Sequence, residues 1–447
     1  MKVIKKYADK IALLTLRACS LKRSRGFIRT SCLLIVVSCF HASILTNPLA
    51  NRSVSYSAAD RLELSAGRPL TIRLRAVLQV GTNSDKPLMS FSGDGQVIAI
   101  GTGKGPVKIW NALTGALIAT LDGTNGQSPR AFSPVNDRLL ASANLKSVSL
   151  YDINAMKLRS QIVLDKLFGG LNFFGSFSPD GQEFIINSED KGKVSLWDVK
   201  TARLIVSVPC REILFQSRFS HDSQTFLTAC GDRIVTLWDT QTGKAMMTFS
   251  NPNDVSVSAL SPDSKTVVTA TLQGQVLIWD ASNGQLIKSW QGHRDLISYA
   301  GFSHDGKIIA TVSRDGDTKL WDIENLKLKH TLRSGSSALY AVFSPDSKLV
   351  VIVGEGKREF PVWDVSTGVP VFNITGHRKE IFNVEFSNDG LLASSSDDTV
   401  NVWDVANKKH VARLSDASFP VQFSKDGRTI ATSGLKGTVS LWDVAPQ

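Results

Sequence analysis

Apolar and polar residues alternate with a period of two over many short stretches of this chain. Residues 390–395 and residues 399–403 are examples, and a tight turn separates such stretches from their neighbours. A period of two places successive side chains on opposite faces of a β-strand, whereas an amphipathic helix needs a period of 3.6. The alternation therefore predicts short antiparallel strands.

The turns share a sequence of the form Phe-Ser-x-Asp-Gly. Asp-Gly between alternating apolar residues is a strong hairpin signal, because Gly tolerates the positive φ that tight turns need. Weaker copies begin at Phe132, Phe219, Leu260 and Phe343, and in three of these Ser replaces Gly. The full copies begin at Phe91, Phe177, Phe302, Phe386 and Phe423.

A Trp-Asp dipeptide or a close variant ends each of nine successive units. The spacing ranges from 39 residues, between Trp403 and Trp442, to 46 residues, between Tyr151 and Trp197. So regular a period is typical of a repeat array, and arrays of this kind usually act as rigid interaction surfaces. The strands and turns expected within each unit predict a four-stranded antiparallel sheet. The nine marks begin at Trp110, Tyr151, Trp197, Trp238, Trp279, Trp321, Trp363, Trp403 and Trp442.

With these marks, residues 68–447 resemble the WD-repeat β-propeller family. Two repeats also match that family in four positions that form a hydrogen-bonded tetrad: a His before the first strand, then a Ser, an Asp and the Trp. The resemblance implies that each tetrad is structural and not a hydrolase site, because the set recurs at the repeat spacing. The predicted tetrads are His293, Ser313, Asp315 and Trp321, and His377, Ser395, Asp397 and Trp403.

The other repeats have no His at that position. There we expect sheet burial alone to hold the blade, with lower local stability. The residues found instead are Thr82, Gly123, Phe168, Cys210, Asn251, Ser334 and Leu414.

The fold class is therefore all-β, a single closed propeller of nine four-stranded blades. The alternative is eight blades with one degenerate unit, because typical propellers have four to eight. The unit ending at Tyr151 is the candidate for it, since it lacks Trp and the usual turn. A strand near residues 70–78 is expected to pair with the last unit, which otherwise ends after its third strand, and so to close the ring.

Charge separates the chain into two parts. The whole sequence has 51 Lys and Arg against 40 Asp and Glu, for a net charge of +11, and residues 1–50 contain nine of the basic residues and one acid. The remainder is close to neutral, so bulk charge predicts no nucleic-acid binding. The propeller is expected to be a monomer.

Residues 1–50 combine this basic character with an apolar run at residues 32–40, which indicates an export signal or membrane anchor. The run is short for a transmembrane helix. Val36-Val37-Ser38-Cys39 resembles the lipobox of bacterial lipoproteins, which makes Cys39 a lipidation candidate. There are three alternatives to lipidation: secretion after cleavage of the leader, a leader kept as an uncleaved membrane anchor, and a cytosolic protein. Residues 51–67 are expected to be a flexible tether.

Two cysteines, Cys210 and Cys230, lie in the propeller. Aligned to the well-matched repeats, they occupy positions that hydrogen-bond each other in the WD-repeat family. The resemblance therefore implies that they are neighbours, and a disulfide would suit an oxidising compartment. Two buried free thiols are the alternative.

The residue after the His position lies, by the same resemblance, on a face that WD-repeat propellers use for partners. It is Arg211, Arg294 and Arg378, with Lys379 following the last. These cations predict a site for an acidic peptide or an anionic ligand; ordinary solvated loop residues are the alternative.

No catalytic residue, metal site or cofactor is predicted, since the seven His lack metal-ligand spacing. The resemblance implies a non-enzymatic protein–protein interaction scaffold. The N-terminal segment predicts a location in the cell envelope or secretion, with membrane binding only through that segment. The alternatives are an exported propeller enzyme or glycan-binding protein with a site at the channel mouth, and a cytoplasmic scaffold.

Overall fold

The computed structural model covers the repeat region. It describes residues 70–81, 87–102, 104–124, 126–136, 138–144, 147–163, 173–188, 193–210, 216–230, 232–333, 335, 338–434 and 437–446. The leader, the tether, Cys39 and Arg211 lie outside the described residues.

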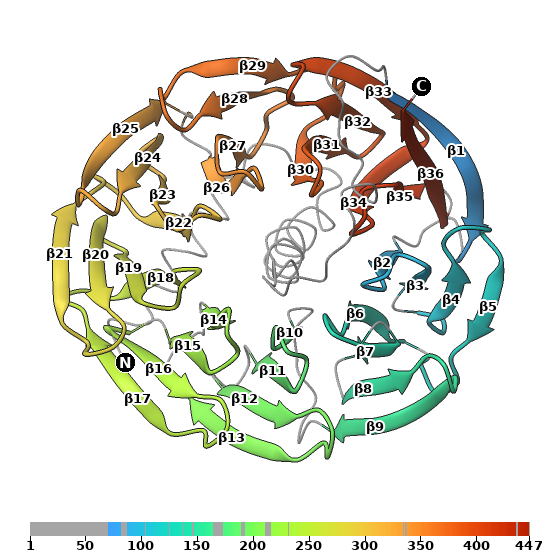
Figure 1. Cartoon of the computed structure of the whole chain (residues 1–447), viewed down its shortest axis with the longest axis horizontal. Coiled ribbons are helices and arrows are strands. Elements are labelled where there is room, and N and C mark those ends of the chain that lie inside the picture. Colours follow the sequence, from blue (N-terminus) through green and yellow to red (C-terminus); the bar gives the residue numbers. More distant parts are fainter. Residues whose placement is uncertain are drawn as a thin grey trace, which may run out of the picture.

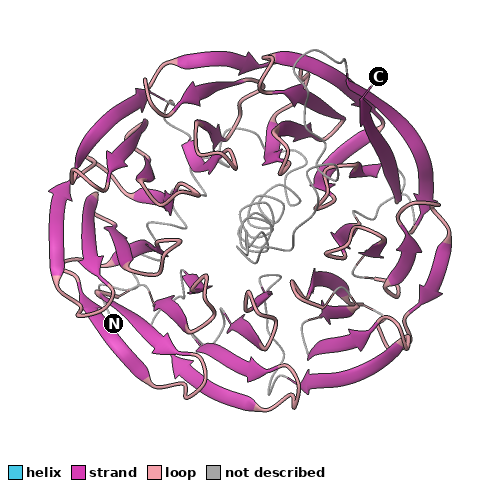
Figure 2. Ribbon diagram, in the orientation of Figure 1, coloured by secondary structure: helices cyan, strands magenta, loops and turns pink. Residues whose placement is uncertain are grey.

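The described residues form nine antiparallel sheets of four strands each, arranged as blades around a central axis (Figure 1). Strands and connecting loops account for all of the described chain, with no helix among them (Figure 2). The all-β class and the nine-bladed count predicted by the repeats are confirmed, and the eight-bladed alternative is wrong. The ring has one blade more than the usual range of four to eight.

Blades 1 to 9 follow the chain, and each contributes one strand to each of four concentric positions (Figure 1). The innermost strands are β2 (Leu88–Phe91), β6 (Ser128–Phe132), β10 (Phe173–Phe177), β14 (Gln216–Phe219), β18 (Val255–Leu260), β22 (Ile297–Phe302), β26 (Ala338–Phe343), β30 (Ile381–Phe386) and β34 (Ala417–Phe423). The second strands are β3 (Val97–Gly101), β7 (Leu139–Ala143), β11 (Glu183–Ser188), β15 (Thr225–Ala229), β19 (Thr266–Thr271), β23 (Ile308–Ser313), β27 (Leu349–Gly354), β31 (Leu391–Ser396) and β35 (Thr429–Gly434).

The third strands carry the Trp-Asp marks. They are β4 (Lys108–Asn111), β8 (Ser147–Asp152), β12 (Lys193–Asp198), β16 (Ile234–Asp239), β20 (Gln275–Asp280), β24 (Asp317–Asp322), β28 (Phe360–Asp364), β32 (Thr399–Asp404) and β36 (Thr438–Pro446). The outermost strands are β5 (Leu117–Thr120), β9 (Lys157–Val163), β13 (Leu204–Pro209), β17 (Ala245–Ser250), β21 (Leu286–Gln291), β25 (Lys327–Arg333), β29 (Pro370–Ile374), β33 (Lys409–Ser415) and β1 (Leu70–Gln79).

The ring closes through strands from opposite ends of the sequence. β1 pairs antiparallel with β36, from Leu70 opposite Pro446 to Gln79 opposite Thr438, with one bulge near Arg75. The Arg75 guanidinium binds the Asp443 carboxylate and donates to the carbonyl of Ala112, 2.6 Å away in blade 1. Blade 9 is therefore completed by an N-terminal strand, and the long edge of β36 is paired rather than exposed.

Blade 2, which ends at Tyr151, is a complete four-stranded sheet. The Tyr151 side chain is buried in the place of the missing Trp, and its hydroxyl donates to the Asp122 carbonyl at 2.8 Å. The sheet is therefore complete although this unit lacks the Trp of the other repeats, because a Tyr ring can be buried at the same position.

The core lies between neighbouring blades. Leu392 and Trp403 of blade 8, for example, pack in one cluster with Phe360 of blade 7. The Asp-Gly turns also meet across blades: Gly427 lies at φ +71°, and a β-carbon there would approach the Asp389 carboxylate to 2.7 Å. Gly at this turn thus serves both the positive φ and the close approach of adjacent blades.

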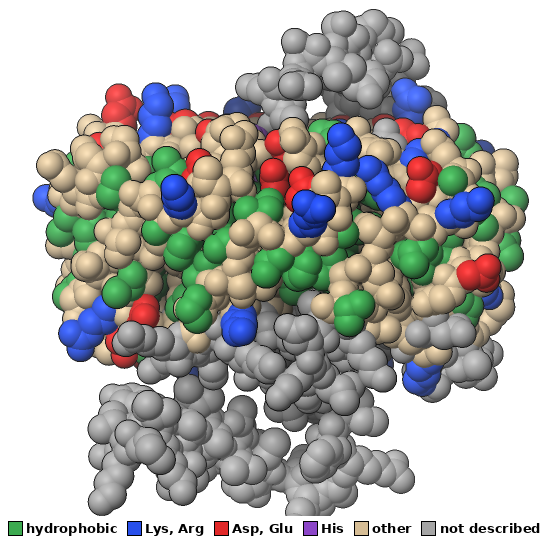
Figure 3. Space-filling view, turned by 90° about the horizontal axis from the view of Figure 1, so that it is seen from below, with side chains coloured by type: hydrophobic (Ala, Val, Ile, Leu, Met, Phe, Trp, Pro, Cys, Tyr) green, Lys and Arg blue, Asp and Glu red, His purple; other side chains and the backbone are tan. Residues whose placement is uncertain are grey.

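The outer wall of the ring carries apolar side chains among the charged ones (Figure 3). Exposed apolar side chains on the outermost strands include Val77, Met246 and Leu286, and Val369 lies in the turn just before β29. Among the described residues, no helical segment has the length and apolar character needed to cross a bilayer.

Candidate functional site

The first predicted tetrad lies in blade 6 and forms a continuous hydrogen-bonded chain. Trp321 Nε1 donates to Thr311 Oγ1 at 2.9 Å, and Thr311 Oγ1 lies 2.8 Å from His293 Nε2. His293 Nδ1 lies 3.1 Å from Asp315 Oδ2. Burial lowers the pKa of His293, against the opposing effect of Asp315, so the ring is neutral at pH 7, donates to Asp315 and accepts from Thr311.

Asp315 is positioned by the loops on either side of it. Its carboxylate accepts from the backbone N–H of Arg294 and of Asp317, both at 3.0 Å. Burial acts to raise its pKa, but these two donors together with His293 outweigh it, and the pKa is lowered. The carboxylate thus ties the loop before β22 to the turn between β23 and β24.

The predicted serine of this tetrad is wrong: Thr311, and not Ser313, bonds Trp321 and His293. Successive residues of a strand face opposite sides of the sheet. Ile309 is the cross-strand partner of Trp321, so Thr311, two residues on, shares its face and lies within reach. Ser313 lies two residues further and instead donates to the Asp295 carbonyl at 3.1 Å.

The second tetrad, in blade 8, differs from the prediction at two positions. Trp403 Nε1 donates to Ser394 Oγ at 3.2 Å, and Ser394 Oγ lies 2.8 Å from His377 Nε2. The other ring nitrogen of His377 lies 3.1 Å from Thr399 Oγ1. Ser394 and Thr399 thus occupy the roles assigned to Ser395 and Asp397.

The reason is again strand register. Leu392 is the cross-strand partner of Trp403, so Ser394 shares its face while Ser395 points to the other side. The turn between β31 and β32 is also shorter than the one in blade 6, which brings Thr399 beside the histidine. Burial lowers the pKa of His377 to about 4, so this ring too is neutral.

The same register decides whether the indole nitrogen finds a partner in the other blades that carry Trp on the third strand. In blades 4, 5 and 9, a Thr stands two residues beyond the partner of the Trp, and Nε1 donates to it at 2.9 Å. In blades 1, 3 and 7, an Ile stands there, and the indole nitrogen is buried with no hydrogen-bond partner among the described residues. The Thr residues are Thr228, Thr269 and Thr432, and the Ile residues are Ile100, Ile186 and Ile352.

Blade 5 corrects the expectation that blades without His depend on sheet burial alone. Thr269 Oγ1 donates to Asn251 Oδ1 at 2.5 Å while accepting from the Trp279 indole. Asn251 therefore takes the role of the histidine. Sequence reasoning missed it because an amide acceptor was not considered at that position.

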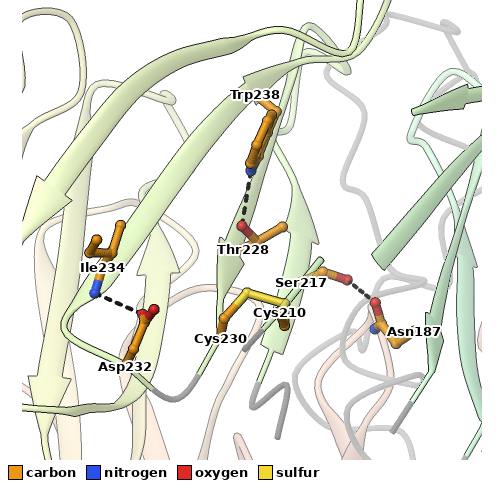
Figure 4. The surroundings of a disulfide bond; sticks show 8 residues. All are labelled: Asn187, Cys210, Ser217, Thr228, Cys230, Asp232, Ile234 and Trp238. Carbon is orange, nitrogen blue, oxygen red and sulfur yellow. Dashed lines mark hydrogen bonds between the residues drawn. A yellow bond between two sulfur atoms is a disulfide. The ribbon is translucent and has the colours of Figure 1, made fainter. Parts of the chain in front are cut away.

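In blade 4, the structure joins Cys210 and Cys230 as a disulfide, with the sulfurs 2.05 Å apart and the α-carbons 5.0 Å apart (Figure 4). Cys210 follows β13, and Cys230 follows β15. Trp238 donates separately to Thr228, so the disulfide adds to the polar contact of this blade rather than replacing it.

Arg294, Arg378 and Lys379 are exposed on the loops that precede β22 and β30. The exposed acids Asp295 and Glu380 lie beside them in these loops. The charge at this end of the inner strands is therefore mixed, and only the cationic side chains of these loops could receive an anion.

A cavity of about 150 Å³ lies at the opposite end of the inner strands, beside the Phe-Ser-x-Asp-Gly turns of blades 1, 2, 8 and 9. Glu385 is the only carboxylate among its lining residues. The described residues include no group of three or more His, Cys, Asp or Glu that could hold a metal ion. One carboxylate without a partner acid does not make the pair that glycoside hydrolysis uses.

Comparisons with known proteins agree with this fold. Residues 213–239, 368–404 and 410–443 match the family described as WD domain, G-beta repeat. The crystal structure of the computationally designed Ika8 protein is similar to 83% of this chain and 99% of its own, with a TM-score of 0.56 and 19% identity. This chain is a nine-bladed β-propeller, and three of its segments are similar to WD repeats.

Each of the relatives that follow is similar to only one segment of this chain. Coronin-7 of Rattus norvegicus is 30% identical over 127 residues, covering 25% of this chain and 14% of its own length. Actin-interacting protein 1 of Drosophila melanogaster is 33% identical over 108 residues, covering 23% and 18%. Eukaryotic translation initiation factor 3 subunit I of Candida albicans is 29% identical over 160 residues, covering 31% and 45%. In each case the match spans less than half of the relative.

Residues 260–377 also match the family described as cytochrome D1 heme domain. The buried histidines of this segment do not fit an iron ligand. His293 and His377 each use both ring nitrogens in the hydrogen bonds that hold their blades. Coordination by either would break a tetrad, so we derive no chemistry through haem.

Proposed function

We propose that this chain is a non-enzymatic scaffold that docks protein partners. The observation that carries the proposal is that the buried polar side chains have a structural role. The His, Thr, Ser and Asp side chains of each set form hydrogen bonds with one another within a blade and hold its strands together. The similarity to WD-repeat proteins, among them one named for interaction with actin, supports the same role.

The docking face we propose is the end of the ring that carries Arg294, Arg378 and Lys379. The backbone beneath Arg294 is held by Asp315, which leaves its guanidinium exposed on a fixed loop. Because acids lie between these cations, the partner should be a short acidic segment that reaches individual guanidinium groups by charge-assisted hydrogen bonds.

Charge reversal tests this face. The double variant Arg294→Glu, Arg378→Glu should lose partners that the unmodified protein captures from cells of its host, measured by quantitative mass spectrometry. Lys288→Glu, Lys327→Glu is the matched control, because it changes net charge equally on the exposed outermost strands. Equal partner recovery by both variants would rule out the face.

We further propose that the propeller is exported and held at a membrane by its N-terminal segment. The basic leader and the apolar run before Cys39 support this, and so does the Cys210–Cys230 disulfide, because disulfides persist in oxidising compartments. A fusion of residues 1–60 to a reporter that is active only outside the cytoplasm should be active. The Cys39→Ser variant should release the fusion from the membrane fraction if the anchor is a lipid, and an inactive fusion would contradict export.

A further inference from the structure

The cavity beside the Phe-Ser-x-Asp-Gly turns contains two hydrogen-bond acceptors without partners. Glu385, on β30, and Gln422, on β34, both line it. Glu385 Oε2 and Gln422 Oε1 are buried, and neither has a hydrogen-bond partner among the described residues. A buried acceptor left unpaired destabilises the folded protein, so a ligand that donates to both would recover that free energy.

The remaining lining combines polar side chains, mostly serines, with four phenylalanine rings. Phe91, Phe132, Phe386 and Phe423 line the cavity, one from each of four inner strands that follow one another around the ring (Figure 1). Aromatic rings attract a cation through their negative faces, most strongly where water is excluded. The combination of rings with one carboxyl and one amide oxygen favours a positively charged donor.

The size of the cavity limits the ligand. A volume of about 150 Å³ is well below the roughly 300–1,000 Å³ of ordinary small-molecule sites, and it matches a cavity that holds one benzene-sized group. The site can therefore hold the end of one side chain or one small cation.

We propose that this cavity binds an organic cation with at least two N–H donors, of the kind found at the end of an arginine or lysine side chain. The cation would donate to Glu385 Oε2 and Gln422 Oε1 while contacting the phenylalanine rings. The site lies at the opposite end of the inner strands from Arg294, so it is independent of the docking face proposed above.

The ionisation of Glu385 is coupled to the binding of a cation in this cavity. Burial raises the pKa of Glu385 to about 8, although the Phe423 N–H, 3.3 Å from Oε1, opposes the shift. Burial disfavours the ionised form of Glu385, whereas a cation bound beside it would stabilise the carboxylate.

The charged neighbour that could interfere is Lys425. It lines the cavity, and its backbone carbonyl accepts from Asn388 Nδ2 at 3.0 Å, while the residue as a whole is exposed. Its ammonium would repel an incoming cation or compete with it for Glu385. Removal of this charge should therefore strengthen binding.

The test is calorimetric titration of the full chain with n-butylguanidinium and n-butylammonium, with neutral n-butylurea as the isosteric comparison. We expect at least one cation to bind at millimolar concentration and at least tenfold more tightly than the urea. Stronger binding of the guanidinium would identify an arginine-like ligand, and stronger binding of the ammonium a lysine-like one. Equal binding of the urea would overturn the proposal, and so would no saturable binding of any probe, which would mean that solvent satisfies both oxygens.

Three variants test whether the cation binds in this cavity. Glu385→Gln should weaken cation binding at least tenfold, whereas the matched variant Glu380→Gln, on an exposed loop of the same blade, should leave it unchanged. Lys425→Gln should strengthen it two- to threefold, and this measurement remains available if Glu385→Gln does not fold. Unchanged affinity in both Glu385→Gln and Lys425→Gln would place binding elsewhere.

Discussion

Blades 6 and 7 are neighbours with the same order of four strands, yet the indole nitrogen of the tryptophan is paired in one and unpaired in the other. The Trp321 indole in blade 6 donates to Thr311 and continues through His293 to Asp315. In blade 7, Ile352 stands in the position of the Thr, and Trp363 Nε1 is buried without a partner among the described residues. Both blades are nevertheless complete sheets.

The difference shows that a blade can form without the hydrogen-bonded tetrad. Burial between blades forms the sheet in both cases, since Ile352 belongs to the large core cluster around blade 7. What the tetrad adds is a fixed loop before the inner strand, because Asp315 holds the backbone of Arg294. Blades with the tetrad are therefore suited to present surface residues, and blades without it contribute mainly to the core.

The largest expected effect comes from removing the central hydroxyl of a tetrad. Thr311→Val would leave the Trp321 N–H and His293 Nε2 buried and unpaired, and should lower the free energy of unfolding by about 2–4 kcal/mol. Urea denaturation followed by Trp fluorescence measures this. Thr331→Val, at an exposed position on β25 of the same blade, should change stability by less than about 0.5 kcal/mol. Similar losses in both would contradict the role of the chain.

A smaller effect tests the blades that lack the hydroxyl. Ile185 and Ile186 are adjacent and both buried in β11 of blade 3, but only Ile186 stands at the position facing the Trp197 indole. Ile186→Thr should therefore cost about 1 kcal/mol less than Ile185→Thr, because its hydroxyl can accept from the unpaired Trp197 N–H. The same denaturation experiment compares the two variants, and an equal cost would show that the indole has another partner.

The smallest effect concerns pH. Burial lowers the pKa of His377 to about 4 from its ordinary value of 6.5, so the neutral form is favoured in the folded state. The stability that this contributes is complete above pH 6.5 and is lost as the pH falls toward 4. Between pH 7 and pH 6 the loss should be about 0.5 kcal/mol.

The variant His377→Asn should lose less stability on acidification than the wild-type protein, because Asn251 shows that an amide can accept from the hydroxyl of a blade. The remaining dependence comes from other histidines with a lowered pKa, such as His293. Thermal denaturation at pH 6 and pH 7 measures the difference for both proteins. If the wild-type protein and the variant lose stability equally on acidification, His377 is not the titrating group.

The sequence by itself determined the class of the fold and the position of the turns. It predicted nine repeats, but only the tertiary structure excluded the alternative of eight blades. The period of the Trp-Asp marks and the alternation between them are local patterns, and they survive even where a single mark is lost, as at Tyr151. The strand expected near residues 70–78 is β1, whose pattern already resembled an outermost strand.

Only the tertiary structure decided which hydroxyl completes each tetrad. Counting back from Trp leads to Ser313 and Ser395, whereas the bonds are made by Thr311 and Ser394. In blade 8, Ser394 and Ser395 lie on opposite faces of the strand, so the strand register decides between them. In blade 6, Thr311 and Ser313 share a face, and Thr311 is the one within reach of Trp321. The cavity at Glu385 and Gln422 likewise could not be seen in the sequence, because its walls come from the first and the last blades of the chain, which meet only when the ring closes.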